Sequence, residues 1–544
     1  MEPDPAAPPA RGTAASSLIF LGTGCSGALP DTRCLLRPST PPCAVCSMGL
    51  SLPPERNPNY RLNTSLLIDY CHDDGSHKYI LIDIGKTFRE QVLRWFVHHK
   101  IPSVDSIILT HEHADAVLGL DEVSVVQPSN DRNEIQQIPI FLTQFTMDSV
   151  VRRFPYLVEQ KPEDGDEDAQ TAKIDWNIIE DDVDKPFVAS GLKFVPLPVM
   201  HGEGYICLGF LFGRRARVAY ISDVSRFLPK TEHAISKSGV GQLDLLILEA
   251  NALHGVGDAF STHLTLSESL DAIKRIRPKR ALLIGMRHFF EHQRENQMLA
   301  EWSIRSAEPK KRTVALTSAV TSPRVSMEPD PNTSPAEGTA AAAAVSPSSS
   351  LIFLGTGCST ALPDTRCLIR PPTPPCAVCS TALSLPPDRN PNYRRLNSSL
   401  LIDYYCHDDG THKYILIYIG KSFREQVLRW FVHHNVPSVN SDGEVWIVQP
   451  GNDRNDIEQI PICSPDSQRT ARFPYLVERM PEDGDEDARA AQLDWKIIEG
   501  DVSKSFVSSG LEFVPLPVRT GYARRGLYLF RLLIWEENQS CIFI

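Results

Sequence analysis

The chain has 544 residues, enough for two or three domains of ordinary size, and its 42% hydrophobic content is typical of a globular protein. Its net charge of −12 is spread along the chain, so composition indicates no general attraction to nucleic acid or to an anionic membrane. No run of about 18 apolar residues occurs, and acids and prolines near the start disfavour a secretion signal. We therefore expect an intracellular protein, with a cytoplasmic location favoured and a plastid location left open by the alanine and serine content of the first residues.

An internal repeat organises the chain. The stretch LIFLGTGCSGALPDTRCLLRP begins at Leu18 and returns as LIFLGTGCSTALPDTRCLIRP at Leu351. Repeats so far apart are whole domains rather than units of a solenoid. Serine, proline and alanine between the two copies are typical of a linker. We predict a disordered N-terminus over residues 1–17, a first domain over 18–307, a linker over 308–350 and a degenerate, truncated second copy over 351–544.

Strands alternate with helices in the first copy. Residues 88–99 place Phe88, Val92, Trp95 and Phe96 on one helical face, and residues 269–276 form a second helix. Short β-type runs that end in polar or glycine residues occur, in chain order, at 17–25, 65–70, 78–85, 105–110, 217–223, 243–250 and 280–286. This alternation predicts an α/β fold, with functional groups in the loops that leave its strands.

One of those loops carries a metal-binding pattern. His111, His113 and Asp115 follow the strand DSIILT within five residues. Zn²⁺, Mn²⁺ and Fe²⁺ accept such a mixture of imidazole and carboxylate ligands. An ion there lowers the pKa of a bound water from about 15.7 towards about 7, which creates a nucleophile at neutral pH. The alternative is a polar turn that happens to contain two histidines.

The segment THEHADAVLGLD resembles the metallo-β-lactamase signature His-x-His-x-Asp-His, and LGTGCSGALP is similar to the PhnP-like branch of phosphoribosyl cyclic phosphodiesterases. The resemblance covers about residues 18–305 and implies a four-layer αβ/βα sandwich with a two-metal site. It assigns ligands of the first ion to His111, His113 and His201, a bridging carboxylate to Asp223, ligands of the second ion to Asp115 and His288, and a supporting role behind the ligands to Asp83.

Several of these assignments have plainer alternatives. His201 could be a buried hydrogen-bonding histidine, and Asp223 could cap a helix that begins at SRFLP. Ala116 stands where the signature has a histidine, so the second ion lacks one ligand. A two-ion site is favoured, and a mononuclear site is the alternative.

Asp115 and His263 are the catalytic candidates. His263, in STHLTL, matches a position where the phosphodiesterase branch has a histidine beside the leaving group, and a group with a pKa near neutrality suits protonation of a departing alkoxide. The alternative is that Thr262 and His263 cap the helix that begins near Leu266.

A second metal site is indicated by cysteines. The chain has 13 of them, which favours reduced thiols or metal ligands over a disulfide framework. Cys34 and the pair Cys43 and Cys46 provide three thiolates in a proline-rich loop. The resemblance implies a structural Zn²⁺ with His292 as its fourth ligand; ordinary reduced cysteines are the alternative. Cys367, Cys376 and Cys379 repeat the trio in the second copy, which has no counterpart of His292.

The second copy lacks the remaining chemistry. It has no HEHAD segment, Thr520 replaces His201, and Tyr418 replaces Asp83. Its sequence after about Leu516 does not resemble residues 205–305. Its four histidines match histidines of the first copy that have no predicted role, namely His407 with His72, His412 with His77, His433 with His98 and His434 with His99.

The leading functional hypothesis is a metal-dependent hydrolase of phosphodiesters, with a cyclic phosphodiester as one option, in which metal-bound hydroxide attacks phosphorus. The expected partners are a small-molecule phosphodiester, no membrane and, with less support, nucleic acid; a homodimer is one option for the assembly. One alternative keeps the site and changes the substrate to an RNA 3′ end, a thioester or a lactam. Another is a non-catalytic metal-binding or scaffold protein, motivated by Ala116 and the second copy.

Overall fold

The computed structural model describes part of the chain, namely residues 16–51, 56–130, 134–158, 172–253, 262–306, 313–316, 349–384, 395–406, 410–436, 460–464, 493–497, 503–509, 511–518, 527–533 and 540–543. Most of the predicted N-terminal tail and of the predicted linker lies outside these residues. Two compact units divide the chain: the described residues of 16–316 with 362–384, and residues 349–361 with the described residues from 395 onwards. No helix in the described ranges is long and apolar enough to cross a membrane.

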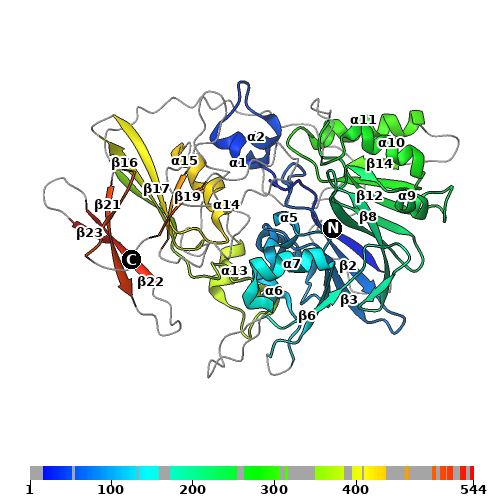
Figure 1. Ribbon diagram of the computed structural model, residues 1–544, viewed down its shortest axis with the longest axis horizontal. Helices are drawn as coiled ribbons and strands as arrows, with labels where there is room; N and C mark the ends of the chain where they lie inside the picture. Colours follow the sequence, from blue (N-terminus) through cyan, green and yellow to red (C-terminus); the bar gives the residue numbers. More distant parts are fainter. Residues whose placement is uncertain are drawn as a thin grey trace, which may run out of the picture. The chain divides into compact units, whose positions relative to one another are not determined.

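Two β-sheets form the body of the first unit (Figure 1). The first sheet has the order β1-β2-β3-β4-β5-β6, with bounds Ser17–Gly22, Ser65–Cys71, His77–Ile82, Ser106–Ile108, Ile138–Leu142 and Ile174–Ile178. The second has the order β11-β8-β9-β10-β12-β13-β14, with β7 paired to β8. In chain order its strands β7 to β14 span Phe187–Ala189, Leu192–Met200, Ile206–Phe212, Val218–Ile221, Arg226–Phe227, Leu245–Glu249, Arg280–Ile284 and Thr313–Leu316.

Each sheet combines antiparallel and parallel pairs. Strands β1 to β3 are antiparallel, whereas β3 to β6 are parallel. Strands β8 to β10 are antiparallel, and β10, β12, β13 and β14 run parallel. The carboxyl ends of parallel strands share one edge of a sheet, where ligands bind in open α/β sheets. β4, β10, β12 and β13 therefore deliver the residues that follow them to such edges.

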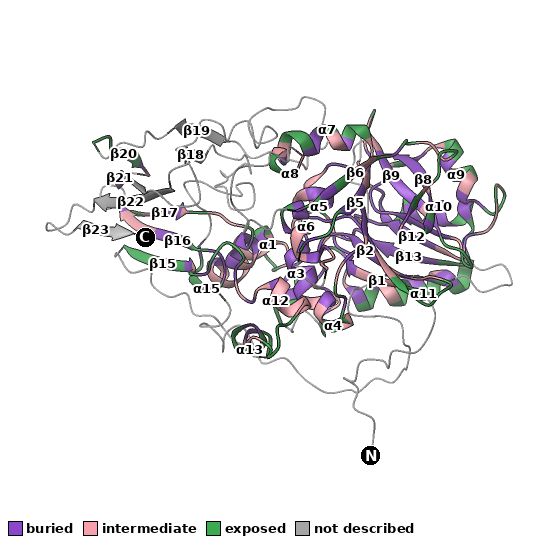
Figure 2. Cartoon of the chain, turned by 90° about the horizontal axis from the view of Figure 1, so that it is seen from below, coloured by how far each residue is buried: buried purple, intermediate pink, exposed green. Residues whose placement is uncertain are grey.

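Side-chain alternation explains why two sheets form a sandwich. Leu66 and Ile68 face an inner core shared with Phe210 and Tyr220 of the second sheet, whereas Leu67 faces an outer core. Because successive side chains of a strand point to opposite faces, a strand inside the sandwich can bury both of its faces. Figure 2 shows these strands as predominantly buried.

Helices cover the outer faces of both sheets. Against the first sheet lie α3 (Phe88–Gln91), the π-helix η2 (Val92–Phe96), α5 (Ala114–Val117), η3 (Leu118–Glu122), α6 (Val123–Val126), α7 (Gln144–Arg153) and α8 (Pro155–Val158). Against the second lie α9 (Pro229–Ile235), α10 (Leu266–Ile276) and α11 (His292–Ser306). The order helix, sheet, sheet, helix confirms the predicted αβ/βα four-layer sandwich. The predicted helical face of Phe88, Val92, Trp95 and Phe96 is buried, and α4 (Val97–His99) ends this segment.

The first domain extends further along the chain than predicted. Residues 313–316, placed in the linker by composition, form β14, which pairs in parallel with β13. Val314 and Leu316 are buried in the outer core, and the Asn296 side chain of α11 accepts a hydrogen bond from the Leu316 backbone N–H at 2.7 Å. A four-residue strand between charged and serine-rich stretches has too short a pattern to be recognised from sequence.

The second unit reproduces the first three strands of the fold. Strands β15 (Ser350–Gly355), β16 (Ser399–Cys406) and β17 (Thr411–Ile417) form a sheet in that order, with a bulge between Phe353 and Gly355 that matches the one between Phe20 and Gly22. The helical segment α14 (Phe423–Gln426), η5 (Val427–Phe431) and α15 (Val432–His434) follows. The remaining strands β18 to β23 span Ile460–Ser464, Leu493–Ile497, Phe506–Ser508, Leu511–Val518, Leu527–Leu533 and Ser540–Phe543.

Candidate metal centre

Three histidines meet at the carboxyl edge of the sandwich. His111 follows β4, His113 precedes α5 as its N-cap residue, and His201 directly follows β8. Their ring centroids lie 4.6 to 5.5 Å apart, and each contributes a nitrogen to a group whose members all lie within 4.8 Å of one another. The two loops are joined because the Leu208 N–H of β9 donates to the Thr110 carbonyl at 3.1 Å. Three imidazoles around one point can coordinate a divalent ion.

His111 is oriented from behind through Thr110. The Asp83 carboxylate accepts hydrogen bonds from the Thr110 N–H at 2.9 Å and from its hydroxyl at 3.0 Å, and that hydroxyl lies 2.8 Å from Nδ1 of His111. The arrangement leaves Nε2 of His111 buried and without a hydrogen-bond partner among the described residues. A buried unpaired ring nitrogen is costly unless it binds an ion.

The Nε2 atom of His201 faces the same centre as Nε2 of His111. Its Nδ1 lies 2.7 Å from the Thr262 carbonyl, which can only accept, so Nδ1 carries the proton. Its Nε2 therefore presents a lone pair and lies 3.3 Å from Nδ1 of His113. Burial and the neighbouring His263 lower the pKa of His201 to about 3, and burial with the two nearby imidazoles lowers that of His113 well below its ordinary value. Both rings are therefore neutral, as metal ligands must be.

Three carboxylates lie around the histidines, and their pKa values reflect both burial and neighbouring charges. Asp223, after β10, is buried, and although burial opposes its ionisation, His111 and His201 lower its pKa. Burial raises the pKa of Asp83 to about 7, and burial and the charge of Asp223 raise the pKa of Asp115. A divalent ion among them would lower the pKa of all three carboxylates. The residues present therefore fit a divalent ion held by His111, His113 and His201, with Asp223 beside them.

The second predicted ion has weaker support from the geometry. Within the described part of the chain, Asp115 joins no group of three potential ligands within 4.8 Å of one another. Ala116 is fully buried, and its carbonyl accepts the Ile84 N–H at 2.8 Å. The alternative role of Asp223 as a helix cap is wrong, because α9 begins at Pro229 with Leu228 as its N-cap residue.

His263 is held by a buried glutamate that the sequence analysis did not single out. Its Nδ1 lies 2.6 Å from Oε1 of Glu249 and 3.9 Å from Asp223, and its ring lies 4.8 Å from that of His201. Although burial opposes its protonation, Glu249 raises the pKa of His263 to about 9. The capping alternative for His263 is wrong, because Thr265 caps α10 in a capping box with Glu268.

The surrounding backbone accommodates the Glu249 side chain. It ends β12, is 1% exposed, and accepts the Val224 N–H at 3.0 Å. Gly285 has a positive φ of 74°, and a Cβ there would lie 3.0 Å from Cγ of Glu249. The sequence does contain one signal for Glu249. The run LLILEA is an apolar strand that is followed by a polar residue, as are the strands that lead to His111 and Asp223.

The structure corrects the roles predicted for His288 and His292. His288, predicted in the active site, has its Nδ1 2.8 Å from the sulfur of Cys34 and 3.8 Å from those of Cys43 and Cys46. A tetrahedral Zn²⁺ places nitrogen and sulfur ligands roughly 3.6 Å apart, so these four residues fit one zinc ion. His292, predicted as the fourth zinc ligand, instead begins α11, where its Nε2 lies 3.0 Å from the Asn296 amide nitrogen.

The reason is the direction in which the chain leaves β13. His288 follows the strand closely and its loop faces the segment with α1 (Thr32–Leu36) and α2 (Ala44–Ser51), whereas the start of α11 turns His292 towards Asn59, whose Oδ1 accepts the His292 N–H at 3.0 Å. Hydrogen bonds with Cys46 and His288 lower the pKa of Cys34 to about 5, so its thiolate forms readily.

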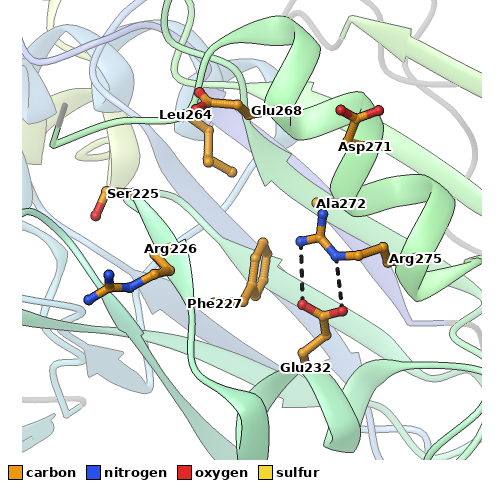
Figure 3. Close-up of a pocket in the computed structure, with 9 residues that line it drawn as sticks. All are labelled: Ser225, Arg226, Phe227, Glu232, Leu264, Glu268, Asp271, Ala272 and Arg275. Carbon is orange, nitrogen blue, oxygen red and sulfur yellow. Dashed lines mark hydrogen bonds and ion pairs between the residues drawn. The ribbon is translucent and has the colours of Figure 1, made fainter. Parts of the chain in front are cut away.

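Residues that are close in sequence to the histidine centre line an open surface cavity of about 250 Å³ (Figure 3). Among its lining residues, Ser225 lies two residues after Asp223, and Leu264 lies one residue after His263. Glu232 and Arg275 face each other across it, with 3.0 Å between Oε1 and Nε. None of the predicted metal ligands lines it.

Comparisons with known proteins match part of the chain to a known domain family. Residues 78–286 match the model of the beta-lactamase superfamily domain. An octanoyltransferase of Porphyromonas gingivalis is 29% identical over 270 residues, which is 50% of this chain and 46% of that protein, so the chain spans less than half of that relative's length.

Two solved structures are among those similar to the chain. A diphosphatase from the PhnP family is 26% identical, with a TM-score of 0.41, over 56% of this chain and 95% of its own. A Zn²⁺-bound PqqB from Methylobacterium extorquens is 16% identical, with a TM-score of 0.39, over 56% of this chain and 98% of its own.

Proposed function

Because residues 78–286 are a beta-lactamase superfamily domain, we propose that the first copy is a metal-dependent hydrolase that cleaves phosphodiesters. The observation that carries the proposal is the convergence of His111, His113 and His201 on one point, with a buried, unpaired Nε2 on His111. We propose one ion, zinc or manganese, rather than the two that the signature favours, because Asp115 and His288 do not join this group among the described residues.

The chemistry that an ion supplies at this centre, when bound, is a lowered pKa of water and neutralisation of negative charge on a phosphoryl oxygen. Asp83, through Thr110, keeps Nε2 of His111 directed to the centre, and the Thr262 carbonyl does the same for Nε2 of His201. Such outer contacts fix the tautomer and orientation of histidine ligands.

His263 supplies the proton for the leaving oxygen. With Nδ1–H donated to Glu249, its second proton is on Nε2, and a pKa of about 9 keeps the ring protonated at neutral pH. Transfer of the Nε2 proton to the departing alkoxide leaves a neutral imidazole still held by Glu249. The substrate class rests on this histidine and on the opening LGTGCSGALP, which resemble the phosphodiesterase branch.

The proposal is tested with the full chain, stripped of metal by a chelator and reloaded with Zn²⁺ or Mn²⁺. A chromogenic phosphodiester, a 3′-extended tRNA and an acyl thioester are offered separately. We expect cleavage of the phosphodiester that depends on reloading by at least about 1,000-fold, because the ion provides the nucleophile. Preference for RNA or the thioester would change the substrate class. Binding of metal without turnover of any substrate would support the non-catalytic alternative.

Replacing Glu249 with glutamine should lower kcat about 10- to 100-fold while metal content stays unchanged. The amide cannot stabilise a protonated His263, so the ring loses its proton at a lower pH and the alkaline limb of the pH–rate profile moves to lower pH. Metal analysis and a pH–rate profile check this. The matched control is Glu232→Gln, because Glu232 pairs with Arg275 outside the centre. A kcat equal to that of wild type would remove Glu249 from the mechanism.

A further inference from the structure

The second copy contains a cysteine cluster that the proposed hydrolase does not use. Cys367 lies in α12 (Thr365–Ile369), Cys376 directly precedes α13 (Ala377–Ser384), and Cys379 lies in its first turn. Their three sulfur atoms all lie within 4.8 Å of one another. Two sulfurs of a tetrahedral zinc site lie about 3.8 Å apart, because each Zn–S bond is about 2.3 Å. The spacing is thus compatible with one ion bound by three thiolates.

The local fold holds the cysteines in place. Asp364 caps α12 by accepting the Cys367 N–H at 3.1 Å, and the Ser380 N–H donates to the Cys376 carbonyl at 3.0 Å. Cys379 is 3% exposed, whereas Cys367 and Cys376 are half-buried. The site is therefore formed by the chain itself, and two of its three thiols are partly exposed.

Three thiolates this close together repel one another unless a cation lies among them. A soft divalent ion would replace this repulsion with coordination.

The cluster differs from that of the first copy in its fourth ligand. In the first copy the Nδ1 of His288 lies 2.8 Å from Cys34 and completes a set of four. In the described ranges of the second copy, no His, Cys, Asp or Glu atom joins the trio within 4.8 Å. The four histidines of that copy correspond to His72, His77, His98 and His99, and none corresponds to His288.

We propose that Cys367, Cys376 and Cys379 bind a Zn²⁺ ion through three thiolates and leave its fourth position to an exchangeable ligand from solution, either water or a small thiol. Thiolates select zinc among the common divalent ions, and zinc with three protein ligands keeps an open position. The cluster of the first copy, with four protein ligands, is closed. The two related segments thus form one closed and one open zinc site.

Metal content of the full chain tests the site. The variant Cys376→Ser/Cys379→Ser should lose one zinc equivalent relative to wild type, whereas Cys358→Ser should lose none, because Cys358 is an exposed cysteine outside the cluster. An unchanged zinc content in the double variant would overturn the proposal.

Wild-type protein provides a test that does not depend on folding of a variant. After removal of metal, Zn²⁺ should slow alkylation of Cys367, Cys376 and Cys379 at least about 10-fold, as measured by peptide mass spectrometry, because coordinated thiolates are poor nucleophiles. Cys358 should react at the same rate with and without zinc. Equal alkylation rates of the trio with and without zinc would contradict the site.

The open position is tested with Co²⁺ in place of zinc. A small thiol should shift the visible absorption of wild type more than that of the Cys376→Ser/Cys379→Ser variant, in which only the ion held by His111, His113 and His201 can respond. Protection of the trio without a spectral response to the thiol would overturn the exchangeable ligand and indicate a fourth ligand from the chain. Neither result depends on hydrolase activity, so failure of this site and failure of the proposed function are distinguishable.

Discussion

Replacing His113 with alanine is expected to reduce hydrolysis of the chromogenic phosphodiester at least about 1,000-fold, a loss of roughly 4 kcal/mol of transition-state stabilisation. His113 provides one of the three nitrogens that converge on the centre, and its Nδ1 lies 3.3 Å from Nε2 of His201. Two remaining imidazoles hold an ion weakly, so metal analysis should show loss of the active-site equivalent.

The control for this variant is His98→Ala, because His98 is exposed on α4 and lies outside every group of potential ligands among the described residues. It should retain metal and turnover. High concentrations of Zn²⁺ or Mn²⁺ should restore part of the activity of His113→Ala, since the lost contribution is affinity for the ion. Equal turnover by His113→Ala and wild type would eliminate the hydrolase proposal for this centre.

Replacing His288 with alanine is expected to remove the zinc of the first cysteine cluster and to lower the melting temperature by at least about 5 °C, because about 1 kcal/mol shifts a domain of 150–250 residues by roughly 2–4 °C. The imidazole links the loop after β13 to Cys34, which lies 254 residues earlier in the chain. An ion bound by both segments stabilises the folded state, and its loss leaves three thiolates without a fourth ligand.

His292→Ala is the matched control, because it removes a histidine four residues away that contacts Asn296 instead. It should retain the full zinc content, even if the cavity left in a buried position lowers stability. Zinc loss in His292→Ala with retention in His288→Ala would restore the assignment made from resemblance. Metal content measured by mass spectrometry separates the two outcomes irrespective of any change in melting temperature.

Local patterns predicted much of the fold. The β-type runs at residues 65–70, 105–110 and 243–250 became β2, β4 and β12, because period-two alternation and branched side chains act locally. Strand β14 escaped prediction because its four residues gain stability only from pairing with β13 and from packing on α11. Tertiary packing overrides composition in such short segments.

The candidate centre could be predicted where its ligands lie at the ends of recognisable strands. His111, His113 and His201 come together as the sequence predicted, and Asp223 lies beside them. Glu249 was missed because a glutamate at a strand end has no distinctive spacing, and its role depends on Gly285 and His263, which the chain brings near only on folding.

By itself, the sequence determined the repeat, the α/β alternation, the metal-binding pattern and the two cysteine trios, because each of these is a local arrangement of side chains. Only the tertiary structure decided between His288 and His292. Both lie within five residues and carry the same side chain, so no local property distinguishes their partners. The direction in which the chain leaves β13 directs one imidazole to the sulfurs of α1 and α2 and turns the other towards α11.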